Sequence, residues 1–187
     1  MAIFKPNYVK KILIKPCKTK KGIKKATQWL NEKFKDNNKE VVFVCVLKGA
    51  SPFFINLIMQ IKFDVTTEFV TMSSFRGKTK AEGDPELLTD FINEIKGKDV
   101  VVVEDVCDSA KTLSKLINHI KGKKPHSVTT VVLVDKPDTR KVKFNPDYSC
   151  FKIYNNPFLI GYGLDIKEIA RNLPYIAEFD KDYLNKI

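Results

Sequence analysis

The sequence predicts an α/β protein with a doubly wound, mostly parallel β-sheet flanked by helices. Three apolar, valine-rich runs carry this prediction, because they have the length and composition of strands covered on both faces. They occupy residues 41–47, 100–103 and 128–134. Helical segments alternate with these strands, and strand-helix-strand connections in one sheet are right-handed. The carboxyl ends of the strands therefore meet at one edge, where open α/β sheets bind ligands.

The first helix is expected at residues 23–35, where apolar and small side chains recur at helical spacing on one face. Those side chains are Ile23, Ala26, Thr27, Leu30 and Phe34. The strand 41–47, VVFVCVL, comes next. Ser51 as N-cap and Pro52 at the first helical position then predict a helix that ends near residue 61.

The second half of the chain continues the alternation. Residues 65–72, VTTEFVTM, predict another strand, and residues 73–84, SSFRGKTKAEGD, contain no tight hairpin turn. Polar loops of that length in a compact domain are usually lids or disordered segments, and we expect a flexible lid at 73–84. The strand 100–103, a helix at 111–121 and the strand 128–134 complete the predicted core.

Length and composition narrow the class of protein. The 187 residues suit one domain with its own core. No apolar run approaches the roughly 20 residues of a membrane span, and no signal-peptide core precedes the first helix, so a cytoplasmic protein is expected. The four cysteines share no CxxC spacing, which argues against a zinc site or a disulfide framework; they are Cys17, Cys45, Cys107 and Cys150.

The formal net charge of +11 fits either a solvated lysine-rich surface or a polyanion-binding patch. The lysines are spread along the chain, and the densest cluster, KTKKGIKK at 18–25, adjoins the first helix, which favours the solvated surface. A small, phosphate-rich substrate would be attracted by the same field. Charge alone therefore does not indicate a nucleic acid.

The stretch DVVVVEDVCDSAKTL, residues 99–113, carries the main functional signal. Residues 109–112 lie between a strand end and a helix start, where free backbone N–H groups bind phosphate, and Ser109 and Thr112 add hydroxyl donors. Acids repel phosphate, so Glu104, Asp105 and Asp108 indicate other partners: sugar hydroxyls, a divalent cation or a proton. Together these features indicate a phosphorylated sugar.

Other interpretations of this stretch explain less. Capping of the next helix accounts for one acid and leaves two unexplained. The stretch does not match GxxxxGK[ST], and the chain has no GxGxxG, so the usual nucleotide-binding motifs are excluded. The other two buried strands also end in charged segments, LKGAS at 47–51 and VDKPD at 134–138. Three polar strand ends at one edge define a candidate site.

Residues 100–112 resemble the 5-phosphoribosyl-1-diphosphate (PRPP) signature of the type I phosphoribosyltransferases: four hydrophobic residues, two acids, two more residues, Asp, and a small hydroxyl-rich loop. VLKGAS at 46–51, LVDKPDTR at 133–140 and FLIGYGLDIKEIARNLPYI at 158–176 are similar to the hypoxanthine-guanine branch. The resemblance implies the type I phosphoribosyltransferase fold in a single domain, 1–187. Its core would span about 23–140, and a small hood would comprise the N-terminal segment and about 141–187.

The resemblance also implies how PRPP would be held. Glu104 and Asp105 would bind its ribose hydroxyls, directly or through Mg2+, which is the expected cofactor. Asp108 would face the purine N7 as general base or proton holder. The 5-phosphate would be held by the loop of Asp108, Ser109, Ala110, Lys111 and Thr112.

The pyrophosphate and the purine have their own implied contacts. Lys48 and Gly49 match a segment whose unusual, often cis, peptide contacts pyrophosphate; glycine there would supply conformational freedom. Arg171 and the lid residues Ser74 and Phe75 would bind pyrophosphate as well. For the purine, Lys136 would donate to the 6-oxo group, Phe158 would stack, and the backbone of Leu159 and Asp165 would read the other edge. Asp165 would also ligate Mg2+.

Two positions depart from the family pattern. Phe75 follows Ser74 where the family generally has tyrosine, and backbone contacts should still allow a working lid. Ala110 stands where the family most often has glycine. We expect Ala110 at negative φ, because Lys111 begins a helix that a right-handed turn can enter, with the N–H groups of residues 110–112 converging on a phosphate.

The expected reaction transfers phosphoribose from PRPP to N9 of hypoxanthine or guanine, giving IMP or GMP and pyrophosphate. A xanthine-preferring enzyme and a PRPP-sensing, RNA-binding regulator on the same fold are the alternatives. Lys136, Phe158 and Asp165 argue against the regulator, which need not keep a purine site. A homodimer or homotetramer is expected, with neither a membrane nor a nucleic acid as partner.

Overall fold

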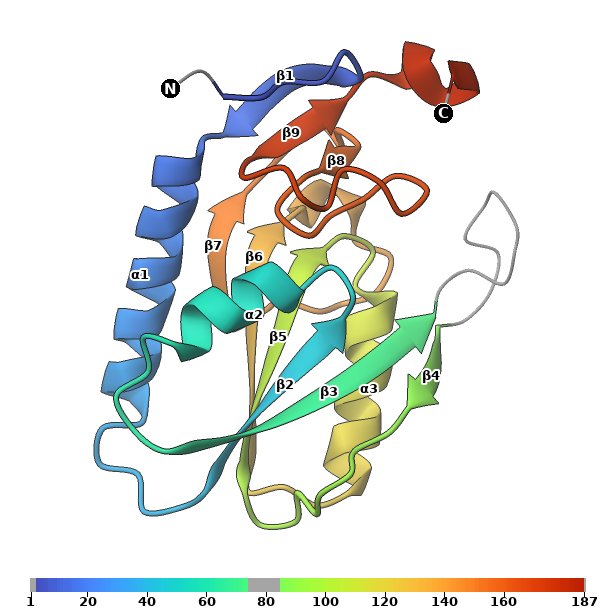
Figure 1. Ribbon diagram of the computed structural model, residues 1–187. Helices are drawn as coiled ribbons and strands as arrows, with labels where there is room; N and C mark the ends of the chain where they lie inside the picture. Colours follow the sequence, from blue (N-terminus) through green and yellow to red (C-terminus); the bar gives the residue numbers. More distant parts are fainter. Residues whose placement is uncertain (1–2, 74–84, 187) are drawn as a thin grey trace.

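The computed structural model describes residues 3–73 and 85–186. Its main sheet has six strands in the order β4-β3-β2-β5-β6-β7 (Figure 1). Five of them run parallel: β2 (Val41–Leu47), β3 (Val65–Ser73), β5 (Asp99–Cys107), β6 (Ser127–Asp135) and β7 (Tyr148–Lys152). The edge strand β4 (Glu86–Thr89) is antiparallel to β3. The predicted fold class is confirmed.

Helices cover both faces of this sheet. Helix α1 (Pro16–Lys33) and helix α2 (Ser51–Ile58) pack on one face, in a cluster that includes Phe43 and Val101. Helix α3 (Lys111–Gly122) packs on the other face, against Val44 and Val102. Because strand side chains alternate between faces, the all-apolar strands are explained by burial on both sides. No helix within the described ranges is long and apolar enough to cross a membrane.

A second, three-stranded antiparallel sheet lies above the carboxyl ends of the main strands (Figure 1). Its order is β1-β9-β8, with β1 (Val9–Ile14), β9 (Ile176–Phe179) and β8 (Leu159–Ile160). Tyr175 is fully buried beneath it and donates its hydroxyl to the backbone oxygen of Phe4 at 2.8 Å. Short 3-10 helices, η1 (Pro137–Thr139) and η2 (Lys181–Lys186), complete the described elements. This sheet is the small hood expected from the sequence.

Several boundaries differ from the predictions. Helix α1 begins at Pro16, not near residue 23, because the buried face continues one turn earlier through Thr19, and Gly22 allows close packing. Ser51 is not the N-cap of α2: Ala50 holds that position, and the Ser51 hydroxyl donates to the Lys48 oxygen at 2.7 Å. Helix α2 ends at Ile58, earlier than predicted. Strand β4 was not predicted.

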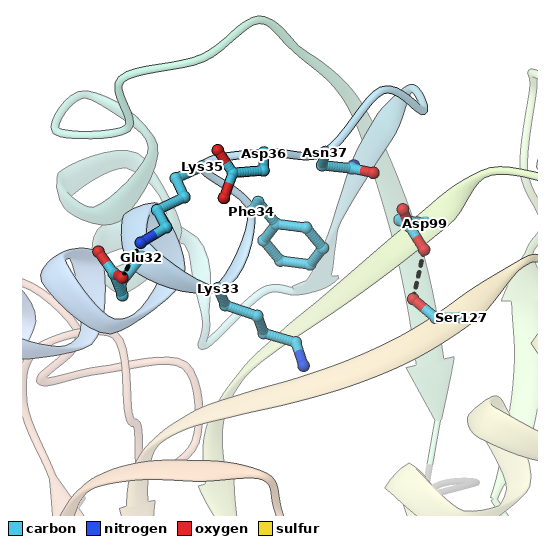
Figure 2. A pocket seen from close by; sticks show the side chains of 8 residues that line it. All are labelled: Glu32, Lys33, Phe34, Lys35, Asp36, Asn37, Asp99 and Ser127. Carbon is cyan, nitrogen blue, oxygen red and sulfur yellow. Dashed lines mark hydrogen bonds and ion pairs between the residues drawn. The ribbon is translucent and has the colours of Figure 1, made fainter.

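An open polar hollow lies at the amino ends of the main strands, away from the hood, near the starts of β2, β5 and β6 (Figure 2). Its deepest carboxylate belongs to Asp99, which is 3% exposed. Asp99 Oδ1 accepts a hydrogen bond from the Ser127 hydroxyl at 2.5 Å and lies 2.8 Å from His126 Nδ1. Burial alone would raise the pKa of Asp99, but these hydrogen bonds outweigh it and the pKa is lowered.

Candidate active site

The loop between β5 and α3 turns the chain from strand into helix within residues 108–110. Ala110 makes that turn as the N-cap of α3, in the left-handed region with φ 62°. The prediction of a negative φ at Ala110 is therefore wrong, and the conformation costs this residue roughly 1 kcal/mol or more. Its methyl group is 5% exposed and packs in the cluster beneath α3, so the turn that enters the helix also buries this side chain.

The rest of this loop is tied to its surroundings. The Ser109 hydroxyl accepts a 3.4 Å hydrogen bond from the backbone N–H of Lys111, and the Ser109 carbonyl accepts one from the N–H of Lys141 at 3.0 Å. The loop thus lies at the start of the 12-residue helix α3, where the dipole favours an anion. Its role as the phosphate loop remains a prediction.

Glu104 and Asp105 end the buried part of β5. Glu104 is 7% exposed, and its Oε1 accepts a hydrogen bond from the backbone N–H of Asp105 at 3.0 Å. Burial raises the pKa of Glu104 well above its usual value, and repulsion from the neighbouring Asp105 adds to the shift. Burial also raises the pKa of Asp105, partly offset by Glu104 and by the charge of Arg171. Buried acids with shifted pKa values are typical of functional sites.

The turn after β2 approaches these acids closely. A Cβ on Gly49 would lie 1.7 Å from Asp105 Oδ2, so only glycine fits there. Gly49 is not among the glycines at positive φ, and its requirement is therefore close approach, where the sequence had suggested conformational freedom. The Leu47-Lys48 peptide bond before it is cis, as the resemblance implied.

Lys136 and Asp108 meet across the ends of β6 and β5. The Lys136 side chain is 5% exposed, and its Nζ donates to Asp108 Oδ2 at 3.0 Å and to Asn156 Oδ1 at 2.5 Å. Arg140 holds the two strand ends together: its Nη1 donates to the backbone oxygens of Cys107 at 2.6 Å and Asp108 at 2.5 Å. Its Nη2 forms an ion pair with Asp135.

A chain of ion pairs joins the β2 turn to the hood. Lys48 Nζ lies 3.1 Å from Glu168 Oε2, and Arg171 Nη2 lies 3.3 Å from the same oxygen. Arg171 Nη2 also lies 2.9 Å from Asp165 Oδ1, and its Nη1 donates to the Gly163 oxygen at 2.8 Å. The three residues predicted to serve the pyrophosphate and metal, Lys48, Arg171 and Asp165, therefore belong to one network.

The predicted purine-stacking residue lies just before β8. Phe158 is 42% exposed, and its ring meets that of Phe179 edge-on, with centroids 5.9 Å apart. Leu159 is buried within β8, where its backbone pairs with Glu178 of β9. An exposed aromatic face held by a buried one is suited to stacking on a flat ring.

Mg2+ prefers oxygen ligands, which the carboxylates of this site could supply. The described ranges contain no group of three or more His, Cys, Asp or Glu side chains that could hold a metal ion. The predicted trio of Glu104, Asp105 and Asp165 is thus not a complete protein cage, and Asp165 is already paired with Arg171. Mg2+ typically takes one or two carboxylates together with substrate phosphates and water, and the buried pair Glu104 and Asp105 fits that pattern.

Sequence reasoning did not assign roles to several residues of the site. Arg140 and Glu168 stood in quoted motifs without a role. Asn156 carried no signal, because its contact is with Lys136, in a different loop. The predicted lid residues Ser74 and Phe75, with the remainder of 74–84, lie outside the described residues.

Comparison with known proteins decides the family. Residues 13–167 match the family model of the phosphoribosyl transferase domain. The hypoxanthine-guanine phosphoribosyltransferase of Mycoplasma genitalium is 34% identical over 174 residues, which cover 93% of this chain and 98% of that protein. The chain belongs to the hypoxanthine-guanine phosphoribosyltransferase family.

Two solved phosphoribosyltransferases share its fold over nearly the full length. A hypoxanthine-guanine phosphoribosyltransferase from Bacillus anthracis is 37% identical, with a TM-score of 0.82 over 91% of this chain and 98% of that one. A mutant hypoxanthine phosphoribosyltransferase from Trypanosoma cruzi, complexed with its product IMP, is 29% identical with a TM-score of 0.89, covering 98% and 90%. Both the sheet and the hood of this chain are thus phosphoribosyltransferase architecture.

Proposed function

We propose that this chain transfers the 5-phosphoribosyl group of PRPP to N9 of hypoxanthine or guanine, giving IMP or GMP and pyrophosphate in purine salvage. The observation that carries the proposal is the 3.0 Å contact between Lys136 Nζ and Asp108 Oδ2 at the phosphate loop. A 6-oxopurine presents O6 and N7 side by side on one edge. In the free base with its proton on N7, this edge offers an acceptor at O6 and a donor at N7–H. An ammonium beside a carboxylate matches it, with Lys136 donating to O6 and Asp108 accepting from N7–H.

The remaining groups of the site would bind different parts of PRPP. The loop 108–112 would hold the 5-phosphate through backbone N–H groups, while Glu104 and Asp105 would accept hydrogen bonds from the ribose hydroxyls. Lys48 and Arg171 would exchange Glu168 for the pyrophosphate oxygens, because a multiply charged leaving group competes well for both cations. Phe158 would cover the purine ring and exclude water.

Catalysis would then rest on charge and proton placement. As the bond from ribose C1 to pyrophosphate breaks, negative charge grows on the leaving group, where Lys48 and Arg171 stabilise it. Asp108 would hold the proton at N7 while N9 attacks C1. Mg2+, held by Glu104 and Asp105 with the substrate, would supply further neutralisation of the pyrophosphate charge.

Organisation and location extend the proposal. We propose one domain, with a lid at 73–84, working as a homodimer or homotetramer in the cytoplasm. Four cysteines without disulfides, Cys17, Cys45, Cys107 and Cys150, are in keeping with a reducing compartment. Gel filtration with light scattering would measure the oligomeric state.

One assay tests the reaction. The protein is given PRPP, Mg2+ and each of adenine, hypoxanthine, guanine and xanthine, and pyrophosphate release is measured. Turnover of hypoxanthine and guanine with little turnover of adenine is expected. Preference for xanthine would replace the proposed substrates, whereas PRPP binding without turnover of any base would favour the regulator.

A variant at Lys136 sharpens this assay. Lys136→Gln should weaken the discrimination of 6-oxopurines over adenine by roughly tenfold or more, because the amide can offer an oxygen to the 6-amino group. Unchanged relative rates on hypoxanthine and adenine would remove Lys136 from purine recognition.

A further inference from the structure

We propose that Asn156 is a positioning residue for purine specificity: its side-chain oxygen fixes the Lys136 ammonium so that one remaining N–H is aimed at the 6-oxo group. This inference rests on the proposed function and deepens it. Asn156 lies between β7 and β8, two residues before the stacking residue Phe158. It therefore connects the segment that covers the purine ring to the group that reads the purine's edge.

The count of hydrogen bonds at Lys136 carries the argument. An ammonium has three N–H donors and no acceptor. In this structure Nζ donates to Asp108 Oδ2 at 3.0 Å and to Asn156 Oδ1 at 2.5 Å. Two donors are committed, and tetrahedral geometry then sets the direction of the third. With Asp108 alone, the ammonium could rotate about that single contact, and neither remaining N–H would have a fixed direction.

An amide oxygen suits this position better than a second acid. Asn156 adds an acceptor without adding charge, so Lys136 keeps a single carboxylate partner, Asp108. The backbone also selects the residue, because Asn156 has φ 44° and its neighbour Asn155 has φ 62°. Asparagine is among the few residues that adopt the left-handed region readily.

The loop itself is anchored near Lys136. The backbone N–H of Asn155 donates to Asp138 Oδ2 at 3.2 Å, which ties the loop to η1, directly after Lys136. The backbone of the preceding residue, Asn155, therefore anchors the loop from which Asn156 contacts the lysine. This arrangement gives a fixed acceptor, which is what aiming a flexible lysine requires.

The consequence for specificity follows from donor placement. Adenine presents a 6-amino group, so a fixed N–H of Lys136 opposes it donor to donor. A lysine freed from Asn156 could swing away and leave adenine less strongly rejected, while its bond to the 6-oxo group of hypoxanthine would weaken. Both changes concern the base, and neither concerns the PRPP contacts.

The test compares three variants in the full-length protein: Asn156→Ala, Asn156→Asp and Asn155→Ala. The matched control Asn155→Ala removes the same side chain at the same kind of backbone position, next to the contact. We expect Asn156→Ala to raise the KM for hypoxanthine about tenfold. Its KM for PRPP should stay within about twofold of wild type, and its preference over adenine should narrow. Asn156→Asp keeps the acceptor oxygen and should restore most of the preference, and Asn155→Ala should resemble wild type.

Equal effects in the two alanine variants, or an unchanged hypoxanthine KM in Asn156→Ala, would overturn the inference. A loss confined to kcat with PRPP and hypoxanthine KM unchanged would also contradict it. Calorimetric titration with IMP gives the same comparison without turnover. A wild-type protein that neither turns over a 6-oxopurine nor binds IMP would overturn the proposed function as well, whereas an active wild type with indifferent Asn156 variants would overturn the inference alone.

Discussion

The two ends of strand β5 carry acids in opposite circumstances. At the amino end, Asp99 is buried and receives hydrogen bonds from Ser127 and His126, so that its pKa is lowered despite burial. At the carboxyl end, burial raises the pKa of Glu104 and of Asp105, and each carboxylate lies beside the other. At the amino end, Ser127 and His126 compensate the buried charge of Asp99. At the carboxyl end, two acids lie next to each other in a buried position.

This difference in pKa direction indicates that the acid at the amino end stabilises the fold, whereas the acids at the carboxyl end serve a function. An acid with a lowered pKa stabilises the folded protein at neutral pH, whereas acids with raised pKa values oppose folding when they are ionised. A fold keeps such a destabilising pair where a ligand compensates for it. We therefore infer that the hollow at the amino end (Figure 2) has a structural role and that substrates bind at the carboxyl end.

The largest effect is expected from the double variant Glu104→Gln, Asp105→Asn. Two charge-assisted hydrogen bonds to ribose hydroxyls become neutral ones, and the two carboxylates proposed to hold Mg2+ are lost. A total loss of about 4 kcal/mol should lower kcat/KM for PRPP roughly 1,000-fold. Stability at neutral pH should be equal to or greater than that of wild type, because two ionised acids no longer share a buried site. Steady-state kinetics and urea unfolding measure the two quantities.

The same pair gives a pH dependence. Since the folded-state pKa values of Glu104 and Asp105 are raised above the ordinary 4.5 and 3.8, the folded protein holds more protons than the unfolded one above those values. The two acids therefore lower the free energy of unfolding as the pH rises from about their ordinary pKa values through their raised, folded-state pKa values. The double variant should lack this loss, and an identical pH profile in both proteins would contradict the assignment.

Asp108→Asn comes next. Asp108 also lies at the carboxyl end but is paired with the cation of Lys136. A substitution there therefore tests the role of the acid in proton transfer without the repulsion between neighbouring acids. The variant should lower kcat roughly 100-fold or more, because it removes proton acceptance. The KM for PRPP should change little, because asparagine keeps the shape and an acceptor for Lys136. Rates within a fewfold of wild type would remove Asp108 from the proposed role.

Asp99→Asn is the counterpart at the amino end. Loss of the charge that accepts from Ser127 and His126 should lower the free energy of unfolding by about 1–2 kcal/mol at neutral pH, with kcat/KM unchanged. Because the folded pKa of Asp99 is lowered from 3.8, the wild-type advantage is present above that value and disappears as pH falls through the lowered pKa. A variant with impaired turnover and intact stability would reverse the comparison between the ends.

The smallest effect is expected at Ala110. Glycine there removes a left-handed penalty of about 1–2 kcal/mol but adds backbone entropy of about 0.5–1 kcal/mol, so Ala110→Gly should raise stability by about 0.5 kcal/mol. Activity should be kept, because the loop path is unchanged. Thermal unfolding would show the gain, and a clear loss of stability would mean that the buried methyl group matters more than the strain.

Sequence reasoning succeeded where a local pattern has one solution. Strand β2 was predicted to the residue, because a seven-residue valine-rich run permits little else. The start of α1 was missed because its first turns are mostly lysine. Gly22 is buried there so tightly that a Cβ would lie 2.6 Å from Phe151 Cζ. A glycine in the sequence indicates such close packing only when the residue that packs against it, here Phe151, is known.

The site shows the same limit more sharply. The acids of β5 and the motif around Lys136 were recognisable because they are contiguous in sequence. Asn156 and Arg140 act through partners that the fold brings together: Arg140 joins the ends of two strands, and Asn156 reaches Lys136 from another loop. The φ of Ala110 was missed for a related reason, since the geometry between β5 and α3 decides it.

The hood sheet has a consequence for the order in which a ribosome would complete the site. Its strand β1 is synthesised among the first residues, but its partner β9 (Ile176–Phe179) is synthesised after all six strands of the main sheet. The loop 108–112 and its flanking elements β5 and α3 are therefore synthesised well before the hood is complete. In the proposed site the hood supplies Arg171 for the pyrophosphate as well as Phe158 for the purine. Both substrates would therefore wait for the hood sheet to close, although the loop proposed for the 5-phosphate is synthesised long before it.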